Sequence, residues 1–317
     1  MMQLKQSFLG LLSVAFVMSG GIAKADQVDI IALISDTSNP YWKTTEDGLE
    51  NTAKEMGIKI NVYSLQNAAD SEGQLNQCEA ALLKNPKAII FSPVDSVNLG
   101  SCLRKATEKK IVLVDIDGNI DENRVKEMGS DVAFSVGSNN YEIGKKAAEY
   151  LDGQTGKVLI IEGPSSSPNG LFRVQGFQEN MGKGLTVIAS QPADWDRLKA
   201  ADITSSVVTK NPDLSIVFAA NDTMALGAVE ALRALNINSV KVIGIDGTVD
   251  AVQSIKEGRL TASVAQLPYL MAKEAIKKTD AFLKDRKALP FRQYVPILTL
   301  DQAVFERNDD PLLQYVR

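Results

Sequence analysis

Short apolar runs alternate along this chain with longer stretches in which apolar residues recur at helical spacing. Short apolar runs bounded by turn residues are typical of strands buried on both faces, whereas the longer stretches are typical of amphipathic helices. Strands are predicted at residues 30–34, 58–62, 88–91 and 111–114. Strands that alternate with helices in this way indicate an α/β fold, in which helices cover both faces of a parallel sheet.

The second half of the chain repeats this pattern. Further strands are predicted at residues 134–136, 158–161, 186–189, 216–219, 240–243 and 260–264, and a late helix at 271–282. A chain of 317 residues is long enough for two domains of ordinary size. We therefore predict two Rossmann-like, doubly wound lobes. Residues 131–138 contain no Pro/Gly/Ser-rich linker, so short strand-like crossings are expected to couple the lobes.

The composition narrows the classes of function. The chain is 44% hydrophobic and 23% charged, which is typical of globular proteins, and its formal charge of -5 disfavours nucleic acid as a partner. It contains no histidine, which removes the commonest metal ligand and general base, together with His-dependent nucleophile systems. We predict no metal site, no cofactor and no enzymatic activity.

Residues 1–25 have the pattern of a secretory signal peptide. Lys5 gives a positive start, an apolar stretch follows, and Ala23-Lys24-Ala25 has the small-x-small form of a cleavage site. No cysteine follows the apolar stretch, which argues against a lipoprotein anchor. Cleavage after Ala25 would leave a periplasmic protein that begins at Asp26.

Polar residues follow several predicted strands directly. Asn221 comes after the apolar run 216–219, and Asp222 is placed to cap the helix that starts at Thr223. Asp117, Trp195, Asp246 and Gln266 follow other strands in the same way. Ligands of open α/β sheets bind at the carboxyl ends of the strands, so these side chains are expected to share one site.

These residue types suit a sugar. Aromatic rings can cover the C–H faces of a pyranose, while carboxylates, amides and a guanidinium group pair with its hydroxyls. The predicted ligand-binding residues are Asn39, Tyr41, Trp42, Asp117, Asn140, Arg173, Trp195, Asn221, Asp246 and Gln266.

Each of these residues also has a simpler interpretation. The two tryptophans could pack in a core, and Asp117 and Asp246 could serve in turns or helix caps. Asp115 with Asp117 could be a glycosidase pair, although a short exposed turn is the simpler explanation. Residues 163–170 are glycine-rich, but no Lys-Ser/Thr pair follows as in a P-loop. The agreement among so many strand ends favours a ligand site.

Several motifs together carry a resemblance to a known family. These motifs are Ser38-Asn39-Pro40-Tyr41-Trp42, the run 189–197, Ala220-Asn221-Asp222-Thr223-Met224-Ala225, Gly244-Ile245-Asp246-Gly247 and Val264-Ala265-Gln266. Together they resemble the motifs of type I periplasmic sugar-binding proteins of ABC transporters, in the allose- and ribose-binding groups. The resemblance covers essentially the whole mature chain. Two positions differ, since Ser35 stands where the allose group has lysine, and Gly118 where the ribose group has arginine.

The resemblance implies two lobes joined by a three-crossing hinge. The N-terminal lobe is expected to comprise residues 26–133 and 267–291, and the C-terminal lobe residues 134–266 and 292–317. Asn39, Tyr41, Trp42 and Asp117 would belong to the first lobe, Arg173, Trp195, Asn221 and Asp246 to the second, and Gln266 to the hinge.

The implied function is periplasmic capture of a monosaccharide, an allose-like hexose or a related sugar, for an inner-membrane ABC permease. The protein would act as a monomer. The alternative is a sugar-sensing subunit for a membrane receptor or kinase, whose binding domain would have the same sequence features. A related repressor is excluded, because an export signal stands where a DNA-binding segment would be.

The chain has two cysteines, Cys78 and Cys102, each on the apolar stripe of its predicted helix. In a flavodoxin-like strand order, 2-1-3-4-5, these helices lie side by side on one face of the sheet. Two buried free thiols are the alternative. An even cysteine count in an exported chain favours a disulfide.

Overall fold

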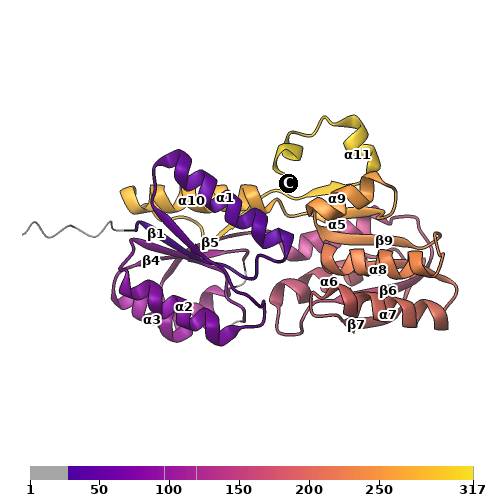
Figure 1. Ribbon diagram of the computed structural model, residues 1–317, viewed down its shortest axis with the longest axis horizontal. Coiled ribbons are helices and arrows are strands. Elements are labelled where there is room, and N and C mark those ends of the chain that lie inside the picture. Colours follow the sequence, from indigo (N-terminus) through magenta and orange to yellow (C-terminus); the bar gives the residue numbers. More distant parts are fainter. Residues whose placement is uncertain (1–27, 96, 119, 317) are drawn as a thin grey trace, which may run out of the picture.

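The protein consists of two α/β lobes that lie side by side (Figure 1). The structure, a computed structural model, describes residues 28–316 except 96 and 119. The predicted signal peptide, residues 1–25, and its cleavage site after Ala25 lie outside the described residues. The two-lobe α/β prediction is confirmed.

The first lobe is built on a parallel sheet with the order β11-β5-β4-β3-β1-β2. Its strands are β1 (Ile30–Leu33), β2 (Ile60–Tyr63), β3 (Ala88–Phe91), β4 (Val112–Ile116), β5 (Val132–Gly137) and β11 (Arg292–Tyr294). Strands β1, β3 and β4 are buried throughout, as their continuous apolar runs predict. The order 2-1-3-4-5 is the one that the sequence analysis assumes.

The second sheet has the corresponding order, β12-β10-β9-β8-β6-β7. Its strands are β6 (Gly156–Glu162), β7 (Leu185–Pro192), β8 (Leu214–Ala219), β9 (Lys241–Asp246), β10 (Ala262–Ala265) and β12 (Leu298–Leu300). β12 pairs antiparallel with β10, whereas the other described pairs of this sheet are parallel. The two lobes therefore share one strand order and differ at the last edge.

Helices cover both faces of each sheet (Figure 1). The first lobe carries α1 (Pro40–Met56), α2 (Ser71–Leu83), α3 (Gly100–Glu108), α4 (Glu122–Glu127) and α10 (Pro268–Asp285). The second carries α5 (Asn140–Tyr150), α6 (Pro168–Asn180), α7 (Arg197–Lys210), α8 (Asp222–Ala234), α9 (Val249–Lys256), α11 (Gln302–Arg307) and the 3-10 helix η1 (Pro311–Tyr315). Local signals set the helix ends: Asn39 caps α1 ahead of Pro40, and left-handed Gly57 ends it.

The chain crosses between the lobes three times, and two crossings lie later than expected. β5 extends to Gly137 within the first sheet, so residues 134–137 belong with that lobe rather than the second. β11 also pairs with β5, which moves the last crossing from Phe291 to the segment between Tyr294 and Leu298. The reason is backbone pairing, which continues along β5 where the sequence shows no break. The middle crossing falls at Gln266, as expected.

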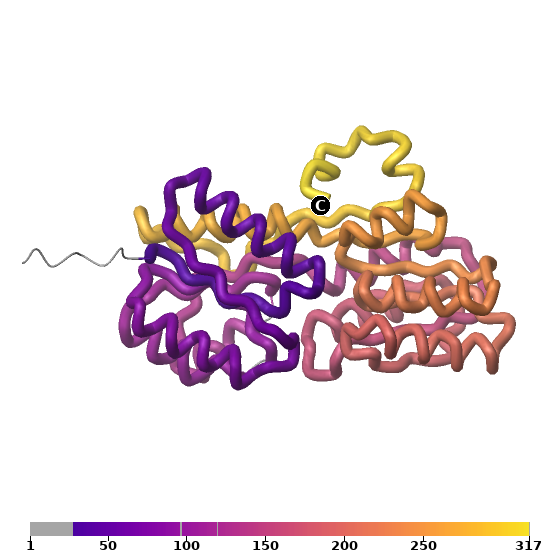
Figure 2. Tube along the Cα trace, in the orientation of Figure 1, coloured from indigo at the N-terminus to yellow at the C-terminus, as the bar shows by residue number. Residues whose placement is uncertain are grey.

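Helix α10 belongs to the first lobe although it follows the whole second sheet in sequence. Figure 2 shows this late segment beside the indigo start of the chain. Met271, Ala272, Ala275 and Ile276 are fully buried in the core that contains Ile30, Leu49 and Ala53. Each lobe therefore depends on segments that are distant in sequence.

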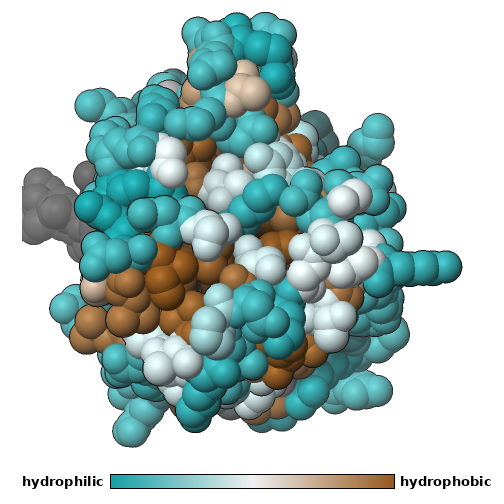
Figure 3. All heavy atoms as spheres, turned by 90° about the vertical axis from the view of Figure 1, so that its right-hand side faces the viewer, coloured by the Kyte–Doolittle hydropathy of each residue, from teal (hydrophilic) through white to brown (hydrophobic). Residues whose placement is uncertain are grey.

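The surface mixes hydrophilic and apolar side chains. Seen from the end formed by the second lobe, teal hydrophilic residues dominate the outline, and apolar residues show between them (Figure 3). Within the described part of the chain, no helix has the length and apolar character needed to span a membrane.

The predicted disulfide is confirmed. Cys78 on α2 and Cys102 on α3 form a disulfide, and both residues are fully buried among the apolar side chains that pack under these helices. The bond closes a loop with a sequence separation of 24. It ties together two helices that cover the same face of the first sheet.

Removing the disulfide should lower the free energy of unfolding by about 3 kcal/mol, because the cross-link restricts the unfolded chain. We expect the Cys78→Ala, Cys102→Ala double variant to unfold at lower urea concentration than the wild type. Dithiothreitol should destabilise the wild type to a similar extent and leave the variant unchanged. Equal stability of the wild type and the double variant would contradict this expectation.

Candidate functional site

A cavity of about 930 Å³ lies where the carboxyl ends of strands from both lobes face each other. This volume is within the range of small-molecule sites. Nine of the ten predicted ligand-binding residues line it, from Asn39 in the first lobe to Gln266 at the middle crossing. The tenth, Asn140, lies behind the lining and contacts Arg173. Their role in ligand binding stays a prediction, but the structure does bring them together.

Arg173 is the buried cation of the cavity. Only 4% of the residue is exposed, and its Nε donates to Asn140 Oδ1 at 2.7 Å. Its Nη1 donates to the carbonyl of Ala220 at 2.8 Å and lies 3.5 Å from Asp246 Oδ1. A buried guanidinium needs such partners because it is costly to desolvate. The ends of β8 and β9 and the start of α5 therefore hold it in one orientation.

Asp246 and Gln266 extend this network toward the hinge. Gln266 Nε2 donates to Asp246 Oδ1 at 2.6 Å, and both residues are at least 95% buried. Burial raises the pKa of Asp246 to about 6, and the nearby Arg173 guanidinium opposes this rise. Gln266 Oε1 is buried and has no hydrogen-bond partner among the described residues.

Two asparagines present amide donors to the cavity. Asn39 Oδ1 accepts from Tyr41 N at the start of α1, and Asn221 Oδ1 accepts from Met224 N at the start of α8. Because the helix caps use the oxygens, each amide nitrogen is left for the cavity that both residues line. Each of these residues therefore presents an amide N–H donor to the cavity.

The prediction that Asp222 caps α8 is wrong. Asn221 has extended backbone and caps the helix, and Asp222 is its first residue. The Asp222 carboxylate instead accepts from Ser263 Oγ at 2.7 Å and from Thr248 N at 2.8 Å, and is fully buried. Burial raises its pKa to about 8, and the Asp246 charge adds to the rise. This side chain braces the loop that carries Asp246.

Trp195 forms one wall of the cavity, and the position of its ring depends on the space left by two glycines. A Cβ at Gly163 would lie 2.3 Å from the indole, and one at Gly170 would lie 3.0 Å from it. Residues 163–170 are glycine-rich without forming a P-loop motif, and two of these glycines provide room for the indole ring. Trp195 has a left-handed backbone at φ 64°, and the Arg173 guanidinium lies 5.7 Å from its ring centroid.

Tyr41 and Trp42 contribute from the first lobe in different ways. Their rings meet edge to face with centroids 5.1 Å apart. Tyr41 is 5% exposed, and its hydroxyl donates to Asp117 Oδ1 at 2.6 Å. Trp42 is half-buried and packs against the core while lining the cavity. The prediction for Tyr41 is a ring that covers a face of the sugar. In the structure its hydroxyl also supports the Asp117 carboxylate.

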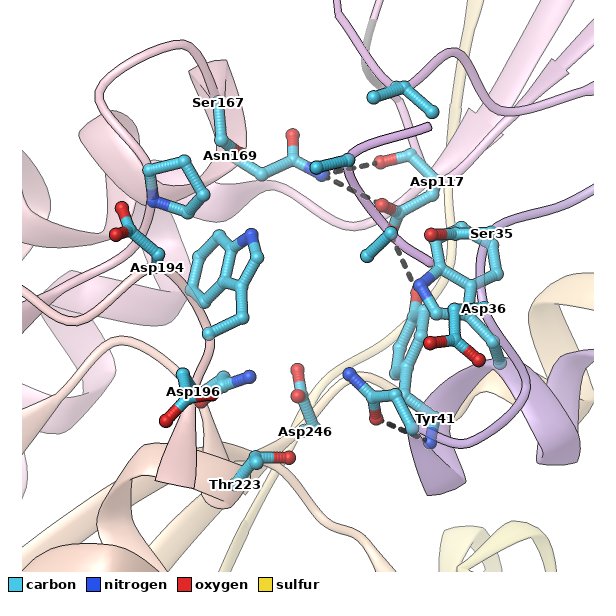
Figure 4. Close-up of a pocket in the computed structure, with 18 of the residues that line it drawn as sticks. Ser35, Asp36, Tyr41, Asp117, Ser167, Asn169, Asp194, Asp196, Thr223 and Asp246 are labelled. Carbon is cyan, nitrogen blue, oxygen red and sulfur yellow. Dashed lines mark hydrogen bonds between the residues drawn. The ribbon is translucent and has the colours of Figure 1, made fainter. Parts of the chain in front are cut away.

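Asn169 is a site residue that the sequence analysis missed. It lies in the first turn of α6, lines the cavity and is 5% exposed. Its Nδ2 donates to Asp117 Oδ2 at 2.9 Å and to the Asp117 carbonyl at 3.2 Å (Figure 4). The available signal was its position in the loop after a buried strand, the feature that singled out the other candidates.

Beneath the cavity, a second polar cluster joins β4, β5 and β11. Asp115 is fully buried, accepts from Ser135 Oγ at 2.5 Å, and has a carboxylate oxygen, Oδ1, with no partner among the described residues. Arg292 donates to the carbonyls of Gly118 and Ile120. Burial raises the pKa of Asp115 to about 7, and the hydrogen bond from Ser135 and the Arg292 charge partly oppose this.

Comparison with known proteins identifies relatives across most of the chain. Residues 30–287 match a family described as periplasmic binding protein domain. The D-allose-binding periplasmic protein of Escherichia coli K12 is 35% identical over 265 residues, which cover 81% of this chain and 85% of that protein. The ribose import binding protein of Salmonella typhimurium is 32% identical over 270 residues, which cover 84% and 88%.

A solved structure shows the same architecture. The periplasmic solute-binding protein of an ABC transporter from Actinobacillus succinogenes, with bound D-allose, superposes with a TM-score of 0.83 at 29% identity. The match covers 88% of this chain and 99% of that one.

The buried Asp115 carboxyl should make stability depend on pH. Its folded pKa of about 7 lies above the unfolded value of about 3.9, so the folded state holds the proton more tightly. The resulting stabilisation is complete below about pH 4 and is lost as the pH rises through about 7.

We therefore expect the free energy of unfolding of the wild type to fall relative to that of Asp115→Asn between pH 4 and 8, by at most about 4 kcal/mol. Asparagine keeps an acceptor for Ser135 and does not titrate. Urea denaturation of both proteins across this range measures the difference. Parallel pH profiles would show that Asp115 does not carry this effect.

Proposed function

Because this chain belongs to the periplasmic binding protein family, we propose that it binds a monosaccharide between its lobes and delivers it to an ABC importer. The proposed location is the periplasm, reached through the signal peptide at residues 1–25, and the proposed partner is the inner-membrane permease. The proposed form is a monomer that carries out no chemistry on its ligand.

The observation that carries this proposal is the cavity itself, which polar and aromatic side chains from both lobes line together. Its polar groups include the Asp246 carboxylate, the Arg173 guanidinium and the amides of Asn39, Asn221 and Gln266.

This set of groups matches a neutral polyol. Each sugar hydroxyl donates and accepts, and the cavity offers an acceptor at Asp246 together with donors at Asn39, Asn221 and Arg173. The guanidinium and the Asp246 carboxylate balance each other's charge, so the ligand need not carry any. Trp42 and Trp195 supply indole rings from opposite lobes, which suit the C–H faces of a pyranose.

The ligand class follows from similarity and from one lining residue. Relatives named for D-allose and ribose support an allose-like hexose or a related sugar. Ser35, where the allose-binding group has lysine, lines the cavity here and offers a short neutral hydroxyl. The site therefore favours a sugar that does not need a cation at this end.

A thermal-shift screen against aldoses and ketoses tests the proposal directly. A sugar that binds only the folded state raises the melting temperature, and the stabilisation grows with the logarithm of its concentration once this exceeds Kd. Solution scattering with the best sugar should show a smaller radius of gyration as the lobes close. If no monosaccharide shifts the melting temperature at millimolar concentration, the proposed ligand class is wrong.

Arg173→Ala should weaken sugar binding by about 2 to 5 kcal/mol, because it leaves Asp246 buried without its cation. Arg173→Lys keeps the charge but loses the bond from Nε to Asn140, so it should bind with intermediate affinity. Titration calorimetry measures both variants.

Arg233→Ala provides the matched control, since Arg233 is an exposed arginine on α8 outside the cavity lining. It should bind sugar like the wild type. Circular dichroism checks that each variant is folded. Unchanged affinity in a folded Arg173→Ala protein would remove this residue from the site.

A further inference from the structure

The Asp117 carboxylate is held from both lobes at once. Oδ1 accepts from the Tyr41 hydroxyl at 2.6 Å, and Tyr41 lies on α1 in the same lobe as Asp117. Oδ2 accepts from Asn169 Nδ2 at 2.9 Å, and Asn169 lies on α6 in the other lobe. Figure 4 shows Asn169 and Asp117 pointing toward each other across the space between the lobes.

The contact between Asn169 and Asp117 is suited to forming when the two lobes close. The single amide nitrogen of Asn169 also donates to the Asp117 carbonyl at 3.2 Å, so it contacts the backbone as well as the side chain of Asp117. Both residues are about 95% buried, and a hydrogen bond to a carboxylate is strong when water is excluded. Asn169 lies in the first turn of a 13-residue helix, where the positive end of the helix dipole also favours the nearby carboxylate.

Asp117 needs such support because of its backbone. Its φ of 78° lies in the left-handed region, which is unfavourable for a residue with a side chain. Gly118, which follows at φ 75°, continues the turn without a side chain. A bond to the Asp117 carbonyl and carboxylate together fixes this strained residue in one orientation.

We propose that Asn169 is a latch and positioning residue: it joins the lobes through Asp117 and completes the orientation of that carboxylate only when the lobes are closed. The inference deepens the proposed sugar-binding function and rests on it for the ligand. Tyr41 orients Asp117 in either state, and Asn169 adds the second bond on closure. Closure of the lobes thereby helps to form the binding site, in addition to covering the ligand.

The distance between the lobes tests the latch without any sugar. Fluorescent labels on cysteines introduced at the exposed residues Glu72 on α2 and Asp202 on α7 report the opening of the lobes by single-molecule energy transfer. Asn169→Ala should shift the population toward longer distances. Asn169→Asp should shift it further, because it places a second carboxylate against Asp117, and lowering the pH should partly reverse that shift.

Sugar kinetics provide the second measurement. Asn169→Ala should release the sugar about ten- to a hundred-fold faster, the value of a hydrogen bond to a charged group, with little change in the association rate. Tyr41→Phe removes the other donor to Asp117 within one lobe. It should weaken binding without moving the distance distribution.

Asn180→Ala is the matched control for loss of an amide on the same helix. Asn180 Nδ2 donates to Tyr141 Oη and to the Gly176 carbonyl, both in the second lobe. This variant should keep the wild-type distances and release rate. Melting curves identify any variant that fails to fold, and Asn169→Asp, which keeps the shape of the side chain, then replaces Asn169→Ala.

The outcomes separate the two proposals. Faster release with an unchanged distance distribution would mean that Asn169 only contacts sugar, and would overturn the latch. Unchanged release and distances would overturn it as well. If the wild type binds no monosaccharide, the function proposed above fails, while the distance measurement still decides whether Asn169 joins the lobes.

Discussion

The burial of the Arg173 charge is the constraint around which the second lobe's half of the cavity is arranged. A guanidinium that is 4% exposed must find partners in the protein, and it finds them in Asn140, the Ala220 carbonyl and Asp246. These groups come from α5 and from the ends of two neighbouring strands. Satisfying one cation therefore fixes the positions of several strand ends at once, and it leaves Asp246 and Gln266 oriented toward the cavity.

The two lobes use the same backbone device at equivalent places. Strands β4 and β9 occupy the same position in the two sheet orders. Asp117 directly follows β4 and Asp246 is the last residue of β9, and a glycine comes next in both cases. Asp117 and Asp246 both have positive φ, as do Gly118 and Gly247. Each aspartate bears a backbone strain of about 1 to 3 kcal/mol, which the surrounding hydrogen bonds must offset. Both carboxylates are accordingly supported by amide donors, Asn169 in one case and Gln266 in the other.

Sequence reasoning recovered what depends on local pattern. Periodicity predicts the strands, and capping chemistry predicts the α1 cap at Asn39. Strand order predicts the Cys78–Cys102 pairing and the gathering of strand-end residues in one cavity. Sequence reasoning failed for features that depend on contacts between residues distant in sequence. β11 joins the first sheet because of its partner β5, and Asp222 is buried because Ser263 and Thr248 satisfy it. Asn169 was missed for the same reason, since its partner Asp117 lies 52 positions earlier in the chain.

The placement of α10 has a consequence for the order in which the molecule can assemble. The core beneath α1 contains Met271, Ala272, Ala275 and Ile276, and the edge strand β11 is added only at residue 292. As the chain emerges from its amino end, the first lobe lacks part of its core until most of the second has been made. The second lobe's central strands are contiguous in sequence and can pair earlier. The first lobe to be synthesised is thus completed only after most of the second lobe has been made, and nearly the whole chain must be present before the cavity has two walls.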